Sequence, residues 1–213
     1  MSPSAEGIGG PAAVGQGAPR AVRLSKVSGD VVVSDGHAHF LEAILQGNAY
    51  GVAMQSGVTS QAGLSATTPI LTLYNPAGSG VNGVLWYAGV TMSVAPAAAM
   101  VVWLGVNTNT AAAAVTGTLT TTHRNLLLGA GSGNKVIPYL AATLPAAPVA
   151  LCTLGVGFAA SLTVQNVTPP LGRFFDGGII LAPNTAISIQ TSTASGTSGL
   201  FGEMLWEEVA VVP

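Results

Sequence analysis

The most constraining feature of this sequence is a long central segment, between Glu42 and Arg124, that contains no Asp, Glu, Lys or Arg. Charged residues make up 7% of the 213-residue chain, whereas about 25% is usual for a soluble domain. A surface with so few charged side chains is poorly hydrated, and extended neutral surfaces are normally covered by other protein or by lipid. The sequence therefore predicts that the chain lies in a membrane or hides its surface against copies of itself or a larger assembly.

A membrane-spanning helix is the first of these alternatives, and the best candidate for it is the apolar segment Val84–Val106. Pro96 lies in its middle, glycines interrupt it, and no Lys or Arg lies near either end to anchor it. Its halves, Val84–Val94 and Met100–Val106, are instead predicted to form two buried strands. The first residues also lack a basic segment followed by an apolar one, so we expect neither a signal peptide nor a membrane partner.

Short β-prone runs separated by turn residues extend from Val31 to the end of the chain, and no long amphipathic helix is evident. About ten strands at this spacing predict an all-β sandwich or barrel. Outer faces of Thr, Ser, Ala, Gly and Asn would suit permanent subunit contacts because they are cheap to desolvate. The predicted strands are Val31–Val33, Phe40–Leu45, Tyr50–Gln55, Pro69–Tyr74, Val84–Val94, Met100–Val106, Ala114–Thr121, Arg124–Leu128, Val149–Phe158, Leu162–Val167, Ile179–Leu181, Ala186–Thr191 and Leu200–Val211.

The N-terminal segment differs in composition from the rest of the chain. Residues 1–35 are rich in Pro, Gly and Ala and hold three of the six basic residues, Arg20, Arg23 and Lys26. Such a segment buries too little apolar surface to fold alone. We therefore expect an extended N-terminal arm over residues 1–35, ordered only against a partner, and one β-sandwich domain over residues 36–213.

Histidines provide the only pattern that suggests a metal site. His37 and His39 would project from one face of a strand, which is how a metal site can begin. With Glu42 and Gly47 they resemble the first motif of the cupins, a jelly-roll family. Only two residues separate His39 from Glu42, and no second histidine motif follows, so we interpret the pair as surface or interface histidines and expect no metal.

Other motifs also argue against catalysis. The glycine-rich run Gly129–Lys135 lacks the Lys-Ser/Thr pair that directly follows the last glycine of a phosphate-binding loop, so a plain inter-strand loop is predicted. Glu207 and Glu208 are adjacent in a strand and must point to opposite faces, so they are interpreted as a solvated strand edge. Cys152 lies in an apolar run and is expected to be a small buried side chain. We expect no enzyme activity and no cofactor.

Several stretches resemble a class of structural proteins from the virions of tailed bacteriophages. The resemblance covers roughly residue 26 to the end. It is carried by Gly29–His37 leading into Glu42-Ala43 and Gly47-Asn48, by Gly63-Leu64, by Leu71–Gly80, by Asp176–Ile189 and by Leu205–Val209. The chain departs from the pattern at Val81-Asn82-Gly83, where a basic residue would be expected.

The resemblance implies a jelly-roll protein, trimeric, that decorates or cements the outside of a capsid by binding the major capsid protein. It also implies that the protein is made in the cytoplasm of the bacterial host, and that the arm around Arg20, Arg23 and Lys26 contacts the capsid. A net charge of −2 gives no reason to expect direct contact with nucleic acid. Alternatives are a head or tail fibre component that contacts the host, and a cupin-like metal enzyme using His37 and His39.

Overall fold

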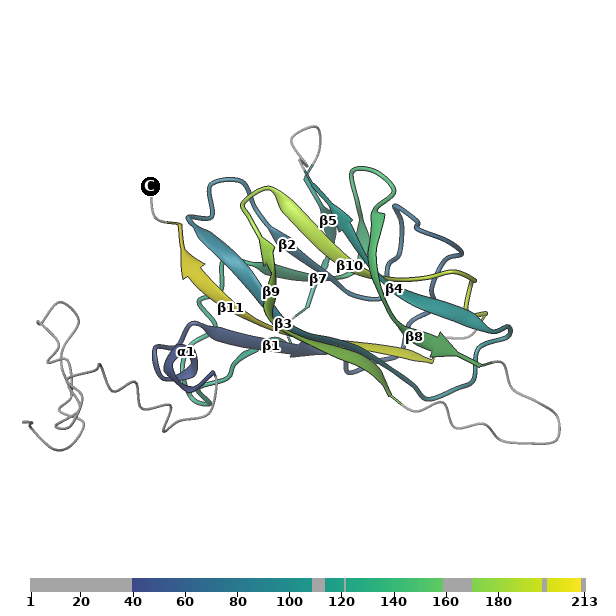
Figure 1. Ribbon diagram of the computed structural model, residues 1–213, viewed down its shortest axis with the longest axis horizontal. Helices are drawn as coiled ribbons and strands as arrows, with labels where there is room; N and C mark the ends of the chain where they lie inside the picture. The colour runs from purple at the N-terminus through teal and green to yellow at the C-terminus, as the bar shows by residue number, and fades with distance from the viewer. Residues whose placement is uncertain (1–39, 109–113, 121, 159–169, 197–198, 212–213) are drawn as a thin grey trace, which may run out of the picture. The chain divides into compact units, whose positions relative to one another are not determined.

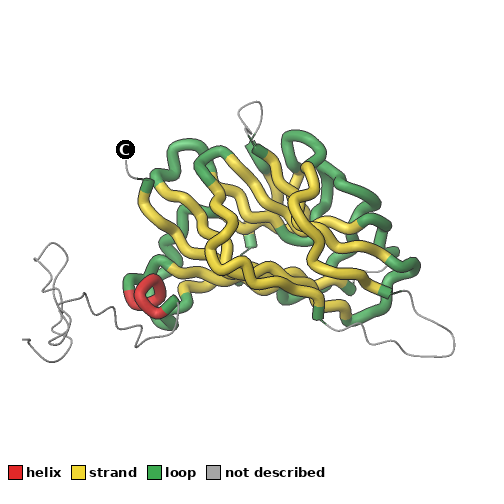
Figure 2. The backbone as a smooth tube through the Cα atoms, in the orientation of Figure 1, coloured by secondary structure: helices red, strands yellow, loops and turns green. Residues whose placement is uncertain are grey.

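The computed structural model describes residues 40–108, 114–120, 122–158, 170–196 and 199–211, and its compact unit spans Glu42–Pro213. Within that unit the strands form two layers (Figures 1 and 2). The first sheet has the order β6 (Arg124–Asn125), β1 (Ala49–Ala53), β11 (Leu200–Ala210), β3 (Val81–Met92) and β9 (Leu171–Leu181). The second has the order β5 (Thr116–Leu119), β7 (Ile137–Thr143), β2 (Thr72–Asn75), β10 (Thr185–Thr191), β4 (Met100–Asn107) and β8 (Val149–Gly157).

All pairings between the described strands are antiparallel, which confirms the prediction of an all-β antiparallel sandwich. Four of the pairings are nested in sequence: β1 with β11, β2 with β10, β3 with β9 and β4 with β8. The strands β5, β6 and β7 come between β4 and β8 in the chain, and they extend the sheets at the ends away from β8 and β9.

The core lies between the sheets and follows the period of two that strands impose. In β11 the side chains of Leu200, Met204 and Trp206 are buried, whereas those of Phe201, Glu203 and Leu205 are partly exposed. Trp206 is fully buried and stacks on Tyr50 of β1, with 5.7 Å between ring centroids. The second sheet contributes buried aliphatic side chains such as Leu104.

A second, smaller apolar cluster contains Tyr74, Val115, Ala142, Leu144 and Ala186. Beside it, the polar residues Ser188 and Gln190 of β10 are also buried. The Gln190 amide donates to the Ser65 carbonyl at 3.2 Å, so the loop that precedes β2 packs over β10. The chain's own loop therefore contributes to the burial of Gln190.

The predicted strand over Phe40–Leu45 is wrong, because Leu41–Leu45 form the helix α1. Its residues have good helix propensity, and the Gln46 side chain donates to Glu42 one turn earlier at 2.8 Å. Gly47 ends the helix with a φ of 73°, the left-handed conformation that glycine adopts readily.

Two further differences from the predicted strands involve the C-terminal half. The sequence does not predict strand β7, because Pro138 and the alanines that follow it are residues seldom found in strands. Strand β9 is longer than the predicted Ile179–Leu181, since the segment Asp176–Gly178, rich in turn-forming residues, is a bulge inside the strand. Asp176 has a φ of 48° there. The predicted strands Val31–Val33 and Leu162–Val167 lie outside the described residues.

The two halves of the apolar segment Val84–Val106 are the strands β3 and β4, as predicted. Among the described residues there is no helix with the length and apolar character needed to cross a membrane.

Candidate interaction surface

The residues expected to contact a capsid, Arg20, Arg23 and Lys26, lie outside the described residues, as do His37 and His39. The third histidine, His123, is described, and its Nδ1 lies 2.8 Å from the Thr120 carbonyl oxygen. Within the described ranges, no three His, Cys, Asp or Glu side chains gather in a way that could hold a metal ion.

The glycine-rich run Gly129–Lys135 is a loop between β6 and β7, as predicted. Its end is held by the chain's own carboxylate. The backbone amide of Lys135 donates to both oxygens of Glu208, at 2.8 and 2.9 Å, and that of Val136 donates to Oε1 at 2.8 Å. The anion bound by these loop amides is thus a side chain of β11.

This contact corrects the interpretation of Glu207 and Glu208 as a solvated strand edge. Strand β11 lies in the interior of its sheet, between β1 and β3, and Glu208 is 7% exposed. Glu207 points to the opposite face, as expected, where Trp86 hydrogen-bonds to it. Burial raises the pKa of the Glu207 carboxyl, although the bond from Trp86 acts in the other direction.

Large exposed apolar side chains gather on β8 and β9, the strands at one end of each sheet. We call these two strands and the residue that follows β8 the β8–β9 flank. Val149 (70% exposed), Ile180 (62%) and Phe174 (61%) are its most exposed apolar members. The others are Leu151, Val156 and Phe158. Exposed apolar residues in such numbers commonly mark an interaction surface.

The two strands of the flank lie beside each other although they belong to different sheets. Leu171 of β9 packs so closely on Gly155 of β8 that a Cβ at position 155 would approach its Cδ2 to 2.8 Å. Arg173 of β9 lies near enough to Cys152 of β8 to act on its thiol electrostatically. Burial raises the pKa of that thiol, and the charge of Arg173 partly offsets this. Cys152 is partly buried and packs against the core, close to the expected burial.

Phe174 is held in position by the outer face of the first sheet. Its ring lies 4.8 Å from that of Tyr87, measured between centroids. The Tyr87 hydroxyl in turn donates to Glu203 Oε1 at 3.0 Å, and burial together with this bond raises the pKa of Tyr87. An exposed aromatic side chain that is already packed on one side loses little further conformational freedom when a partner covers it.

The ends of the two sheets differ in length and character. Away from the flank, the sheets end in the short strands β5 and β6. At the flank they end in β8, with 9 residues, and β9, with 11. Strand β8 contains no charged residue and no proline, the usual devices that keep an edge strand from associating. Both strands contain bulges, and β9 also carries the charged residues Arg173 and Asp176, which protect an end strand from association.

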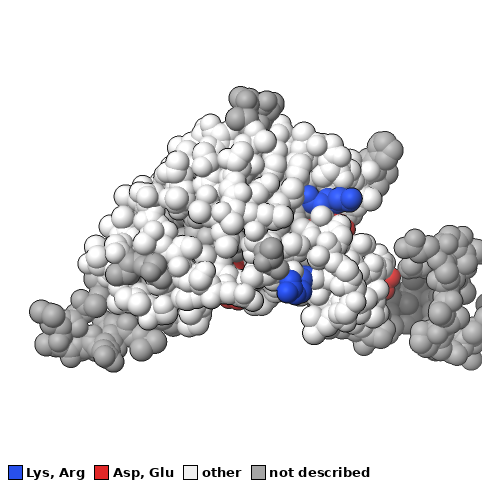
Figure 3. Space-filling model, turned by 180° about the vertical axis from the view of Figure 1, so that it is seen from behind, with Lys and Arg blue, Asp and Glu red and all other residues white. Residues whose placement is uncertain are grey.

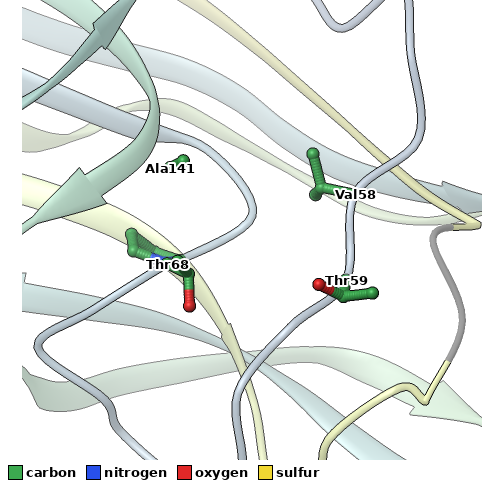
Figure 4. Close-up of a pocket in the computed structure, with 5 residues that line it drawn as sticks. Val58, Thr59, Thr68 and Ala141 are labelled. Carbon is green, nitrogen blue, oxygen red and sulfur yellow. The ribbon is translucent and has the colours of Figure 1, made fainter.

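A shallow pocket of about 290 Å³ lies elsewhere and is lined by Val58, Thr59, Thr68, Pro69 and Ala141 (Figure 4). Thr68 and Ala141 have φ values of 50° and 47°, which are unusual for residues with a Cβ. The lining contains no titratable side chain. It offers space for a small apolar group and no acid, base or nucleophile other than hydroxyl groups.

No family model, curated protein or solved structure matches this chain.

Proposed function

We propose that this protein is a non-enzymatic structural component of a bacteriophage virion. It decorates and cements the capsid exterior by binding the lattice of the major capsid protein as a homo-oligomer, with three copies implied by the resemblance. The observation that carries the proposal is the combination of a charge-poor sandwich with an apolar flank. That surface suits permanent contact with other protein rather than a free existence in water.

The low charge is evident over the whole described part of the chain. Its charged residues number eight: Glu42, Arg124, Lys135, Arg173, Asp176, Glu203, Glu207 and Glu208. On the face shown in Figure 3, Lys, Arg, Asp and Glu appear as small isolated areas in a surface that is otherwise uncharged. A surface with so few charges has little electrostatic cost of desolvation when another protein covers it.

We also propose that the sandwich is a jelly roll, the fold that the resemblance implies. Rolling up one long antiparallel hairpin brings the first strand beside the last, the second beside the next to last, and so on. The nested pairs β1–β11, β2–β10, β3–β9 and β4–β8 support this topology. In this proposal β5, β6 and β7 are an insertion at the tip of the hairpin.

The proposal assigns capsid contact to the N-terminal arm, residues 1–35, through Arg20, Arg23 and Lys26. Many oligomers bound to one lattice, each with several arms, would gain avidity that a single arm lacks. The protein would be made in the host cytoplasm and then reside on the outside of the particle.

The test is co-sedimentation of the purified protein with empty capsids of a phage whose genome encodes it. We expect the full chain to bind at saturable, regularly spaced positions on the capsid exterior, visible by electron microscopy. A variant that lacks residues 1–30 should remain a folded oligomer but lose capsid binding. The proposal is rejected if the full chain shows no affinity for capsids; undiminished binding by the truncated variant rejects only the role of the arm.

A second candidate is a head or tail fibre component that contacts the host. The exposed aromatic side chains Phe158 and Phe174 favour it, because host-contact surfaces often display aromatic residues. The same particles distinguish the two roles: gold-labelled protein located on the shell supports cementing, whereas label confined to fibres supports host contact.

A further inference from the structure

We infer that the outer face of the first sheet binds an arginine side chain presented by a partner protein. The inference goes beyond the proposed function, because it names one face of the sandwich and the chemical group that this face recognises. It is carried by a preformed pair of aromatic rings, by a carboxylate that contacts one of the rings, and by the charge of the described side chains around them.

The register of the strands shows which side chains share this face. Residues directly opposite each other in antiparallel strands point to the same side of a sheet. Leu205 of β11 is opposite Tyr87 of β3, which in turn is opposite Phe174 of β9. The neighbouring pair Met204 and Ala88 is buried in the core, so the row through Tyr87 points outward. Phe174 is the most exposed member of that row, at 61%.

The Tyr87 side chain extends over two glycines, and this fixes its position. A Cβ at Gly89 or at Gly172 would overlap the Tyr87 hydroxyl. That hydroxyl donates to Glu203 Oε1 at 3.0 Å, and the ring packs against Phe174 at a tilt of 50°. Glu203 and Phe174 therefore both contact Tyr87 before any partner arrives. Little further ordering is needed for a ligand to bind to them.

The charge of the face favours a cationic partner. Glu203 is partly exposed, and within the described part of the chain it accepts the bond from Tyr87 and forms no ion pair. Glu207, four residues further along β11, points to the same side. Arg173 of β9 is opposite the buried Ala88, so it points to the other side of the sheet. A cation on this face would therefore meet carboxylates, and a further anion would be repelled.

An arginine side chain matches both the rings and the carboxylate. Its planar guanidinium stacks on aromatic rings and donates to carboxylate oxygens. Val84 and Ile180 are opposite each other on the same face and offer an apolar surface to its alkyl stem. A carbohydrate fits less well, because its hydroxyl groups need several polar partners and the rows through Val84 and Tyr87 are largely apolar.

The test is a ligand-observed NMR titration of the full-length protein with n-butylguanidinium, which carries the guanidinium and the alkyl stem of arginine. The matched neutral probe is n-butylurea, which has the same shape and no charge. We expect the wild type to bind butylguanidinium saturably and about 5- to 30-fold more tightly than butylurea. That ratio corresponds to one exposed cation–π contact together with one exposed ion pair.

Two variants test the groups that the inference names. Glu203→Gln removes the charge but keeps an oxygen that accepts from Tyr87, and Phe174→Leu removes the ring but keeps an apolar side chain. Each should weaken the binding of butylguanidinium about three- to fivefold. The matched controls, Glu42→Gln and Phe158→Leu, make the same changes at exposed positions outside the first sheet and should leave binding unchanged. Circular dichroism and thermal unfolding establish that each full-length variant is folded.

The inference is overturned if the two probes bind equally well, if either Glu203→Gln or Phe174→Leu binds butylguanidinium like the wild type, or if the controls lose as much affinity. Saturable binding of methyl α-glucoside in place of butylguanidinium would assign the face to a carbohydrate and would also overturn it. The titration uses no capsids, so its failure leaves the cementing role in place. A wild type that ignores capsids but binds butylguanidinium as expected rejects the proposed function and supports this inference.

Discussion

Replacement of Glu208 by alanine is predicted to be among the most destabilising substitutions of a polar or charged residue in this chain. Glu208 is a buried carboxylate that accepts the backbone N–H groups of Lys135 and Val136 at 2.8–2.9 Å. Val136 is fully buried and belongs to the core, so its N–H would have no water to replace the lost partner. The loop before β7 would then lose its attachment to β11.

The magnitude follows mainly from the two amide groups; a third donor, Nε1 of the buried Trp206, makes a longer bond of 3.4 Å to Glu208 Oε1. A buried donor left without a partner costs about 1–3 kcal/mol, and bonds to a charged acceptor lie at the upper end of the range. Val136 takes the full penalty, whereas the amide of the exposed residue Lys135 can partly rehydrate. We therefore expect Glu208→Ala to lower the free energy of unfolding by about 2–4 kcal/mol. A domain of this size then loses roughly 5–15 °C in melting temperature.

Two variants make the comparison specific. Glu208→Gln retains an acceptor oxygen for both amides but places an NH₂ group near the Lys135 N–H, so it should cost about half as much as alanine. Glu207→Ala changes the neighbouring carboxylate, which points to the other face and binds Trp86, and should cost about 1 kcal/mol or less.

The assay is urea unfolding followed by tryptophan fluorescence, at one fixed protein concentration because any subunit association would add to the apparent stability. The reasoning is refuted if Glu208→Ala unfolds within about 1 kcal/mol of the wild type. It is also refuted if Glu207→Ala is as destabilising as Glu208→Ala. The hydrogen bonds from the loop amides to Glu208 would then add no more stability than the contacts of the neighbouring carboxylate.

Three other predictions concern single side chains. Because burial raises the pKa of Glu207 above 4.5, the folded state holds this proton more tightly than the unfolded chain, and stability falls as pH rises from about 4.5 through the folded pKa. Glu207→Gln should therefore gain stability relative to the wild type between about pH 4 and pH 7, and a difference that is independent of pH contradicts this. The raised pKa of Cys152 predicts that iodoacetamide alkylates the native thiol more slowly than the thiol of the urea-unfolded chain, and Arg173→Leu should slow it further; equal rates in native and unfolded protein would disprove it. Trp206→Ala should cost about 3–5 kcal/mol in urea unfolding because the indole is fully buried, and a loss below about 2 kcal/mol would show that the site collapses around the smaller side chain.

The sequence by itself determined the class of the fold, because alternation and turn residues are local signals. The strands β4, β10 and β11 were predicted to within one residue at each end, since each has a buried, strongly β-prone run. Local signals failed at α1, where five helix-forming residues were too few to show a period, and at β7, where Pro138 argued against a strand.

Tertiary structure decided which strands stand at the ends of the sheets and therefore which apolar residues face solvent. Leu151 and Leu104 both lie within apolar runs of the sequence, yet Leu151 is 49% exposed and Leu104 is fully buried. The difference arises because β8 has one neighbour in its sheet whereas β4 has two, and strand order depends on pairing between residues far apart in the chain.

The two adjacent glutamates, Glu207 and Glu208, also differ in a way that only the tertiary structure explains. The period of a strand sends Glu207 and Glu208 to opposite faces, and the sequence alone sufficed for that. Only the folded chain brings the amides of the loop before β7 to Glu208, from about seventy residues away along the chain. Composition determined that the surface of this protein carries few charges; the order of its strands decided which of its apolar residues face solvent.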